Sequence, residues 1–255
     1  MIKIDCKKYA DEILEQVAAL PDKGDLLIIT ATPDAASRSY IKGKLSDCTK
    51  CGITANIVEV NDQVSLEQAI QHGNASDTVT GILAEYPLPE ELHAETLISL
   101  SKDVDGSEEN SPFLPCTAEG ILYMLKKELG DLTGKTALVI GRGKLVGKPV
   151  ADLLLAANCT VTVAHSKTHS LENQLTNYDI IVSGVGIPGL IDLTKCRAEM
   201  VVDAGTGIVD GKLRGDCFHF DPENQSDMKV IMMPNGIGLL TRAVLMAHVA
   251  GLPLS

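Results

Sequence analysis

Three glycines at one strand-to-helix boundary are the pattern with the clearest chemical meaning in this chain. Residues 136–149 read Thr-Ala-Leu-Val-Ile-Gly-Arg-Gly-Lys-Leu-Val-Gly-Lys-Pro, an apolar run that ends in glycine and opens into a helical pattern. Gly141, Gly143 and Gly147 would let backbone N–H groups approach a pyrophosphate at the helix N-terminus. The spacing is one residue longer than the commonest fingerprint, so a glycine turn that binds nothing stays open as an alternative.

The segments that follow strengthen the prediction of a dinucleotide site. Residues 160–164, 179–184 and 199–204 are short apolar runs, separated by stretches long enough for helices or loops. This strand–helix alternation predicts an α/β fold with a Rossmann-type, doubly wound parallel sheet.

The residues after the second of these strands indicate which dinucleotide binds. An NAD site usually has an acidic residue there, which bonds the ribose hydroxyls. Here the strand runs into His165-Ser-Lys-Thr168 instead. Arg142 and Lys167 supply positive charge and Ser166 a hydroxyl, which suits a ribose phosphate, so the sequence favours NADP over NAD. Alternatively, Lys167 begins an ordinary solvated loop.

Tyr40 and Lys44 form a second candidate site. They are four residues apart in the predicted helix 34–51, and therefore share one of its faces. An aromatic ring beside an amine suits a flat heterocycle that stacks on the ring next to a proton-transfer group. On this pair alone, a solvated lysine that passes a half-buried tyrosine explains the spacing better.

Two loops add carboxylates to this half of the chain. The segment 81–89 ends a buried strand in Glu85 and two prolines, and Lys102-Asp-Val-Asp-Gly106 is a turn that projects a carboxylate. Open α/β sheets build their sites at strand ends and in the loops that follow. The two loops therefore favour a small-molecule site here.

The remaining patterns predict a second α/β layer and a discontinuous domain. Pro33-Asp34 is expected to open the helix at 34–51. The other expected elements are strands at 26–30, 53–60 and 78–84 and helices at 6–20, 89–100, 117–129 and 237–250. Because the last helix lies beyond the dinucleotide strands, we expect it to pack on the first domain. The predicted domains are residues 1–113 with 236–255, for the substrate, and 114–235, for the dinucleotide, with a cleft between them.

Composition excludes several classes of protein. The 255 residues are 45% hydrophobic, enough for two cores, and no apolar run reaches the ~20 residues of a membrane span. The N-terminus lacks a signal-peptide pattern, which predicts a cytoplasmic location. Seven scattered cysteines do not form a disulfide framework, and Cys48-Thr-Lys-Cys51 lacks a second pair, so no metal site is predicted. A net charge of −12 argues against nucleic acid.

Taken together, these segments resemble the methylenetetrahydrofolate dehydrogenase/cyclohydrolase family over nearly the whole chain. The resemblance implies NADP-dependent oxidation of methylenetetrahydrofolate to methenyltetrahydrofolate, hydrolysis of the latter to formyltetrahydrofolate, and a homodimer. The matching segments are Asp34-Ala-Ala-Ser-Arg-Ser-Tyr-Ile-Lys-Gly-Lys44, residues 81–89, Lys102-Asp-Val-Asp-Gly106, Pro115-Cys-Thr117, Gly141-Arg-Gly-Lys-Leu-Val-Gly-Lys-Pro149, His165-Ser-Lys-Thr168 and Pro234-Asn-Gly-Ile-Gly238.

The resemblance also assigns roles to residues. Tyr40 would stack on the folate, Lys44 would be the catalytic lysine, and Asp105 would hold the amino-pyrimidine edge of the pterin. The candidate catalytic residues are Tyr40, Lys44, Glu85 and Asp105; the same four with Pro234, Asn235 and Gly236 are the candidate folate contacts; Gly141, Arg142, Gly143, Ser166, Lys167 and Thr206 are the candidate cofactor contacts.

Several positions depart from the family pattern. Glu85 stands where the family has a glutamine that orients the lysine, and a carboxylate there favours the ammonium form of Lys44. Gly143 replaces a serine, Asn235 a glycine and Thr206 an apolar residue. Two alternatives therefore remain open: a dehydrogenase with weak or no cyclohydrolase activity, and a catalytically silent relative that binds a dinucleotide or a folate. The further departures are Leu239 in place of a proline and a shorter stretch at 107–114.

Overall fold

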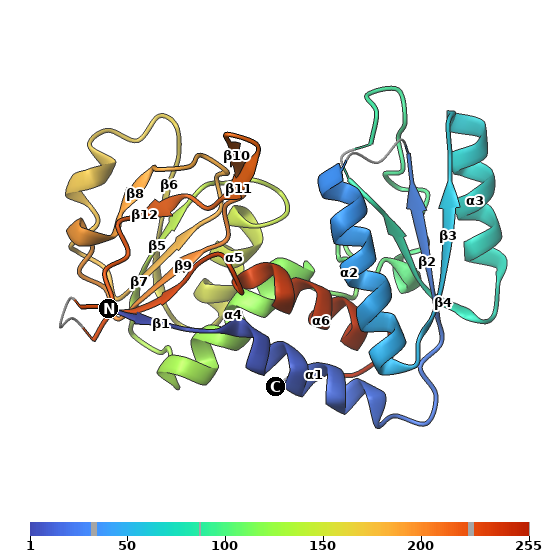
Figure 1. Cartoon of the computed structure of the whole chain (residues 1–255), viewed down its shortest axis with the longest axis horizontal. Coiled ribbons are helices and arrows are strands. Elements are labelled where there is room, and N and C mark those ends of the chain that lie inside the picture. The colour runs from blue at the N-terminus through green and yellow to red at the C-terminus, as the bar shows by residue number, and fades with distance from the viewer. Residues whose placement is uncertain (32–34, 87, 224–226, 255) are drawn as a thin grey trace. The chain divides into compact units, whose positions relative to one another are not determined.

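The computed structural model describes residues 1–31, 35–86, 88–223 and 227–254. The chain divides into two compact units, each built on a parallel sheet (Figure 1). The six-stranded unit contains Met1–Tyr9 and Thr117–Thr241, and the three-stranded unit contains Ala10–Cys116 and Arg242–Ser255. The predicted two-domain α/β class is therefore confirmed.

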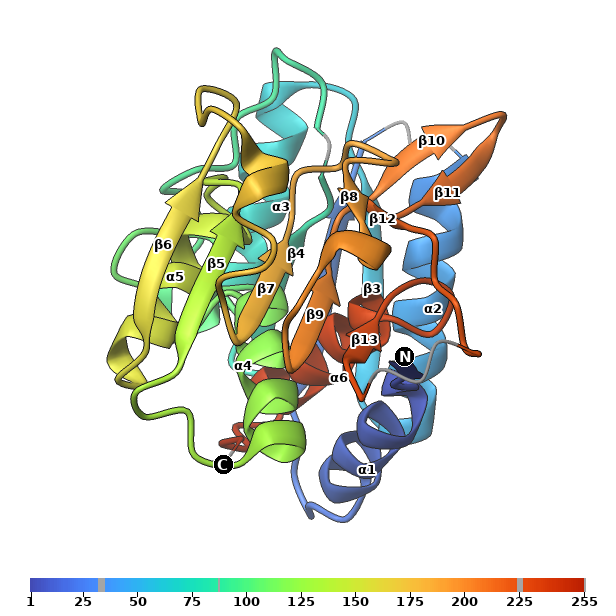
Figure 2. The same ribbon diagram turned by 90° about the vertical axis from the view of Figure 1, so that its left-hand side faces the viewer.

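The six-stranded sheet has the order β1-β13-β9-β7-β5-β6, with every pair parallel (Figure 2). Strand β5 has β6 on one side and β7 on the other, so the strand order reverses beside β5. In open α/β sheets, ligands bind at such a switch point. The bounds are β1 Ile2–Lys3, β5 Thr136–Ile140, β6 Thr160–Ala164, β7 Ile180–Ser183, β9 Met200–Asp203 and β13 Lys229–Ile231.

Smaller elements complete this unit. The hairpin of β10 and β11 projects beyond the sheet in Figure 2. The unit also contains a short parallel pair, β8 with β12. The bounds are α4 Cys116–Leu129, α5 Gly147–Ala156, β8 Ile191–Asp192, β10 Gly207–Val209, β11 Lys212–Arg214, β12 Cys217–Phe218, and the 3-10 turns η2 Leu171–Asn173 and η3 Leu193–Lys195.

The N-terminus belongs to the six-stranded unit, whereas the sequence pattern placed residues 1–9 with the other domain. The reason is that β1 pairs with β13 at the edge of the large sheet, Ile2 opposite Lys229 and Lys3 opposite Val230. Strands of two or three residues carry too short a pattern to be recognised in a sequence. The division also differs at 114–116 and 236–241.

The three-stranded unit is also built on a parallel sheet whose strand order reverses. Its strands are parallel in the order β3-β2-β4, so the order reverses beside β2. Helices α2 and α3 cover opposite faces of this sheet (Figure 1), as right-handed crossovers in opposite directions require. The bounds are β2 Asp25–Thr30, α2 Ala35–Cys51, β3 Thr54–Glu59, α3 Gln63–Ala75, β4 Val79–Ala84 and the 3-10 turn η1 Leu100–Lys102; α1 Cys6–Ala18 and α6 Ile237–Val249 contribute to both units.

The expected helix start at Pro33-Asp34 lies outside the described residues. The helix predicted at 89–100 is wrong: the described part of this segment has no α-helix, because side chains of α3 take its backbone bonds. Gln63 bonds the N–H and C=O of His93, and Asn74 bonds the C=O of Leu97 and the N–H of Ser99.

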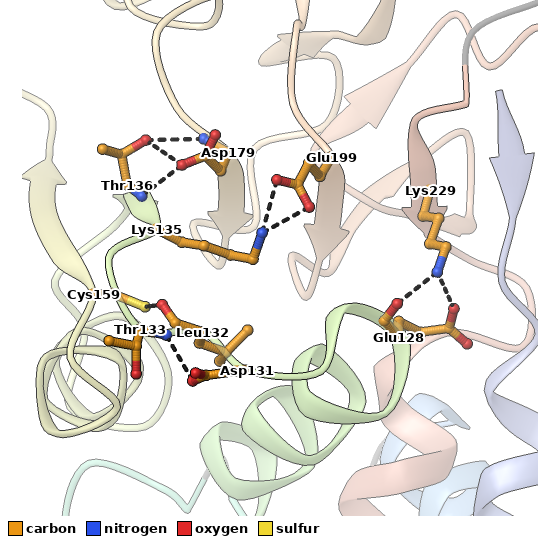
Figure 3. Close-up of polar contacts among 10 residues, drawn as sticks. All are labelled: Glu128, Asp131, Leu132, Thr133, Lys135, Thr136, Cys159, Asp179, Glu199 and Lys229. Carbon is orange, nitrogen blue, oxygen red and sulfur yellow. Dashed lines mark hydrogen bonds and ion pairs between the residues drawn. The ribbon is translucent and has the colours of Figure 1, made fainter.

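The amino ends of the large sheet's strands are joined by polar contacts (Figure 3). Lys135, before β5, pairs with Glu199, before β9, at 2.8 Å. The carboxylate of Asp179, before β7, accepts from the N–H and hydroxyl of Thr136 at 2.8 and 2.9 Å. These hydrogen bonds hold the pKa of Asp179 below its ordinary value.

We expect Asp179→Asn to lower the free energy of unfolding by about 1–2 kcal/mol at pH 7, because hydrogen bonds to a charged group are the stronger ones. Since folding lowers the pKa of Asp179, this stabilisation is fully present above the unfolded value of about 3.9 and is lost progressively as the pH falls from there through the lower folded value. Urea unfolding at pH 7 and pH 3 measures the difference.

Glu199→Gln is the matched control. It removes a charge from a pair whose carboxylate is about half exposed, and should cost less than about 0.5 kcal/mol. An Asp179→Asn variant no less stable than Glu199→Gln at pH 7 would contradict the assignment.

Among the described residues, no helix combines the length and apolar character that a membrane crossing needs.

Candidate active site

The glycine loop follows β5, beside the switch point of the large sheet. Gly141 has φ +114, and its N–H donates to the carbonyl oxygen of Ala164 at 2.8 Å. A Cβ at Gly147 would overlap the carbonyl group of Gly141, so the first turn of α5 packs directly on the loop. A Cβ at Gly143 would meet none of the described residues, so space alone does not require a glycine there. The two close approaches form a cradle of backbone, which fits a pyrophosphate.

The predicted ribose-phosphate residues lie next to this loop. β5 and β6 pair in register up to Ile140 and Ala164, and the chain then turns tightly at 165–168. The turn is fixed by Thr168, whose N–H donates to the His165 carbonyl and whose hydroxyl accepts from the His165 N–H. Ser166 and Lys167 form the tip of the turn, and both are exposed, as is Arg142.

A buried aspartate that sequence reasoning missed shapes the loop after β7. Asp216 is completely buried, and its carboxylate accepts from the hydroxyl of Ser183 and the N–H groups of Val185 and Ile187 at 2.6, 2.9 and 2.7 Å. Three donors replace the water that a buried carboxylate loses. The loop is therefore held at the carboxyl end of β7.

Asp203 does the same for the loop after β9, which carries Thr206. Its carboxylate accepts from the N–H groups of Gly205, Asp216 and Cys217 at 2.9 to 3.0 Å. Thr206 is exposed at the carboxyl edge of the sheet, against Gly186, where an added Cβ would lie 2.9 Å from the Thr206 carbonyl oxygen. Thr206 thus joins the same edge as the glycine loop.

Pro234, Asn235 and Gly236 lie between β13 and α6. The Met233–Pro234 peptide is cis, and Asn235 has φ +63, the left-handed conformation that asparagine tolerates better than most residues. The Asn235 carbonyl accepts from the N–H of Cys6 at 3.0 Å. Pro234 and Asn235 are exposed, so they are available to a ligand.

In the three-stranded unit, Lys44 and Glu85 form a buried ion pair. Lys44 Nζ lies 2.5 Å from Glu85 Oε2, and the two residues are 5% and 6% exposed. Lys44 comes from α2, which follows β2, and Glu85 follows β4; the Glu85 N–H bonds the Ile29 carbonyl of β2. Both charges thus meet at the carboxyl ends of neighbouring strands, on the side of the sheet where sites form.

Tyr40 lies one helical turn before Lys44 and presents its ring to the amine. Lys44 Nζ is 4.5 Å from the centre of the ring. Burial raises the pKa of the Tyr40 phenol above its ordinary value, and the carboxylates of Asp105 and Glu85 raise it further, so the phenol stays protonated. The ring and the amine share one face, as the helical spacing predicts.

Asp105 brings a second carboxylate to this group. Burial raises its pKa to about 6, against the opposing effects of the Lys44 charge and a hydrogen bond from Cys116. The carboxylate is therefore ionised above about pH 6 and available for two parallel N–H donors.

The other residues of the segment 102–106 have structural roles that the sequence did not reveal. Lys102 Nζ donates to the carbonyls of Gly73, Asn74 and Ser76 at 2.8, 3.0 and 2.6 Å, which caps the C-terminus of α3. Asp103 accepts three bonds from residues 107 and 108. The turn that presents Asp105 is thus fixed from both sides.

A further pair that sequence reasoning missed supports α2. Arg242, in α6, pairs through Nε with Asp47 at 2.9 Å. A Cβ at Gly43 would overlap the Arg242 guanidinium, so the glycine makes room for it. Arg242 also lowers the pKa of Tyr40, in opposition to the two carboxylates. α6 therefore fixes the helix that carries Tyr40 and Lys44.

The two units present different chemical groups. One presents a glycine cradle with cations beside it, and the other an aromatic ring, a buried amine and carboxylates. The described residues contain no cluster of histidine, cysteine and carboxylate side chains fit for a metal ion. Fold and site together define the class of dinucleotide-binding α/β enzymes.

Comparison with known proteins identifies the family. Residues 4–105 match the tetrahydrofolate dehydrogenase/cyclohydrolase catalytic domain, and residues 115–252 match the NAD(P)-binding domain of the same family. The chain belongs to the tetrahydrofolate dehydrogenase/cyclohydrolase family, which confirms the resemblance seen in the sequence.

Individual relatives agree with this assignment. The bifunctional protein FolD of Staphylococcus haemolyticus is 37% identical over 255 residues, covering 92% of this chain and 89% of that protein. The structure of the bifunctional FolD enzyme of Campylobacter jejuni is 31% identical with a TM-score of 0.90, and the match covers 98% of both chains. The Trypanosoma brucei FolD structure, complexed with NADP and an inhibitor, is 26% identical with a TM-score of 0.88, over 97% of this chain and 95% of that one.

Proposed function

We propose that this chain oxidises methylenetetrahydrofolate to methenyltetrahydrofolate with NADP and hydrolyses the product to formyltetrahydrofolate. Membership of the family supports both activities. The observation that carries the assignment of residues is the group formed by Tyr40, Lys44, Glu85 and Asp105 in the three-stranded unit. NADP, when bound, accepts the hydride.

For the first reaction, the chain's own contribution is positioning. Tyr40 offers a ring face for the flat pterin, and the Asp105 carboxylate can accept two parallel N–H bonds from its amino-pyrimidine edge. Loss of hydride from the one-carbon bridge leaves a cation shared with the neighbouring nitrogens, so no strong base is needed. The residues therefore act by holding the reacting carbon in place.

The second reaction needs proton transfer. Water adds to the methenyl carbon and the ring opens, so a proton must leave the water and another must reach the departing nitrogen. Lys44 is the proton-carrying group of the site, because its Nζ lies beside the stacking ring. The amine is held in a buried ion pair with Glu85, which supports the alternative of a dehydrogenase with weak cyclohydrolase activity.

An absorbance assay for methenyltetrahydrofolate tests the proposal. It is run with NADP and then with NAD, and followed by hydrolysis of the product. Formation of methenyltetrahydrofolate without its hydrolysis would show that the chain is a dehydrogenase without cyclohydrolase activity. The absence of both activities would show that the chain is a catalytically silent binder.

We assign the preference for NADP to Arg142, Ser166 and Lys167. We expect Arg142→Ala to weaken NADP binding about tenfold or more and NAD binding much less, because a charge-assisted bond to the ribose phosphate is lost. Equilibrium titration of both dinucleotides measures this.

Lys144→Ala is the matched control, since Lys144 is an exposed cation in the same loop. It should affect both dinucleotides alike. Equal loss of NADP and NAD in Arg142→Ala, or tighter binding of NAD by the unmodified protein, would overturn the assignment.

The proposal includes a homodimer that forms through the six-stranded unit. The hairpin β10–β11 exposes Ile208 and Leu213 at 66% and 50%, and the loop after β7 exposes Ile187 at 52%. Large apolar side chains grouped on a projecting hairpin are typical of an interface. Sedimentation should give twice the mass of the chain, and Ile208→Asp with Leu213→Asp should give a monomer. A monomeric parent protein would refute the dimer.

We also place the protein in the cytoplasm. All seven cysteines are buried free thiols, which suits a reducing compartment. Cell fractionation with an antibody to the protein tests the location.

A further inference from the structure

A buried histidine in α6 lies behind the turn that presents Asp105. His248, which is 8% exposed, approaches the Val104 carbonyl oxygen with its Nδ1 at 2.7 Å. A carbonyl oxygen only accepts hydrogen bonds, so Nδ1 carries the proton and donates it. Val104 is completely buried and directly precedes Asp105 in the chain.

The Val104 carbonyl has a second neighbour, the Cys116 thiol, with Sγ at 3.2 Å. The same thiol also hydrogen-bonds the Asp105 carboxylate, which lowers the pKa of that carboxyl. A thiol has a single hydrogen, and it is a weak donor. His248 is therefore the stronger donor to the carbonyl, and the Cys116 thiol, whose Sγ lies 3.5 Å from Nδ1, is the weaker one.

The histidine is itself held in place. The Phe113 ring lies against it, with ring centres 4.9 Å apart. The end of α6 is tied to β4, since the Thr80 hydroxyl donates to the Val249 carbonyl at 2.9 Å. Gly251, with φ +67, closes the helix by donating to the His248 carbonyl. The ring thus gives the Asp105 turn a rigid point of attachment.

We propose that His248 is a positioning residue for folate binding, which fixes the Val104 backbone so that the Asp105 carboxylate meets the pterin. The inference rests on the proposed function of Asp105. A shift of the Val104 peptide moves the next residue, and a carboxylate that must accept two parallel bonds tolerates little displacement. The cofactor contacts, which belong to the other unit, play no part in this role.

The test compares two substitutions. His248→Leu removes the donor and keeps an apolar side chain, and should raise the KM for methylenetetrahydrofolate about tenfold, because a buried carbonyl loses its main partner. The kcat and the KM for NADP should change less than about twofold. His248→Asn places an amide N–H near the position of Nδ1, and should restore the folate KM to within about threefold. Should His248→Leu fail to fold, His248→Gln, whose amide is displaced by one methylene, takes its place.

Thr80→Val is the matched control, because it loosens the same helix end without touching the Asp105 turn. It should leave the folate KM within about twofold. Combining His248→Leu with Asp105→Ala should raise KM no further than Asp105→Ala alone, since one residue acts through the other.

The results distinguish the proposed role of Asp105 from the positioning role of His248. If Asp105→Ala leaves the folate KM unchanged, the proposed role of Asp105 fails. If Asp105→Ala raises KM but His248→Leu does not, or Asn and Leu raise it equally, or Thr80→Val raises it as much, the positioning role of His248 is overturned.

Discussion

Replacing Lys44 by glutamine is expected to lower methenyltetrahydrofolate hydrolysis at least about 100-fold. A positioned proton-transfer group typically contributes 10²–10⁴-fold, and Lys44 is the amine beside the Tyr40 ring. Dehydrogenation should fall much less, because it depends on position and not on a base. Both rates are measured on one preparation by the absorbance of methenyltetrahydrofolate.

Glutamine is preferred to alanine because it keeps a donor for Glu85. Removing one partner of a buried ion pair leaves a buried charge and typically costs 3–5 kcal/mol. Lys42→Ala is the matched control, since Lys42 is an exposed lysine of the same helix. If hydrolysis survives in Lys44→Gln, Lys44 does not carry the proton; if the parent has neither activity, the chain is a silent binder.

The large sheet could be predicted from the sequence because most of its strands are apolar runs of regular length. The runs 160–164, 179–184 and 199–204 correspond to β6, β7 and β9. The edge strand β1 and its neighbour β13 have two and three residues, and their pairing spans almost the whole chain. No local pattern contains such a contact.

The segment 89–100 is a second case in which contacts with distant residues, and not the local pattern, decide the structure. Its composition allows a helix, but Gln63 and Asn74 satisfy its backbone from 23 to 30 residues away. Tertiary contacts thus override a weak local preference.

At the candidate site, residues that are close in sequence could be placed from their spacing. Contacts between residues that are far apart in sequence could not be predicted. Helical spacing alone put Tyr40 and Lys44 on one face. The contrast between Asp103 and Asp105 depends on where the loop runs: Asp103 accepts hydrogen bonds from residues 107 and 108, whereas Asp105 lies near Lys44 and Cys116. Arg242 supports α2 from nearly 200 residues further along the chain, and its sequence context gave no signal of this.

The second large effect is expected from Glu85→Gln, which should raise methenyltetrahydrofolate hydrolysis about tenfold. The carboxylate is 2.5 Å from Lys44 Nζ and both residues are buried, so the ion pair holds the amine that the proposed hydrolysis needs. Glutamine keeps a hydrogen-bond acceptor for the amine and removes the charge. A tenfold change in rate corresponds to about 1.4 kcal/mol in the activation free energy. Dehydrogenation should change less than about threefold.

The contrast between Glu85→Gln and Glu95→Gln separates a local charge effect from a general one. Tyr86 follows Glu85 in the chain, and its hydroxyl lies 3.4 Å from the Glu95 carboxylate. Among the described residues, Lys44 pairs with Glu85 and not with Glu95. Glu95→Gln should leave hydrolysis unchanged. If Glu85→Gln leaves hydrolysis unchanged or lowers it while Lys44→Gln abolishes it, the carboxylate replaces the family's glutamine as the group that orients the lysine. In that case Glu85 assists the hydrolysis that we expect it to restrain.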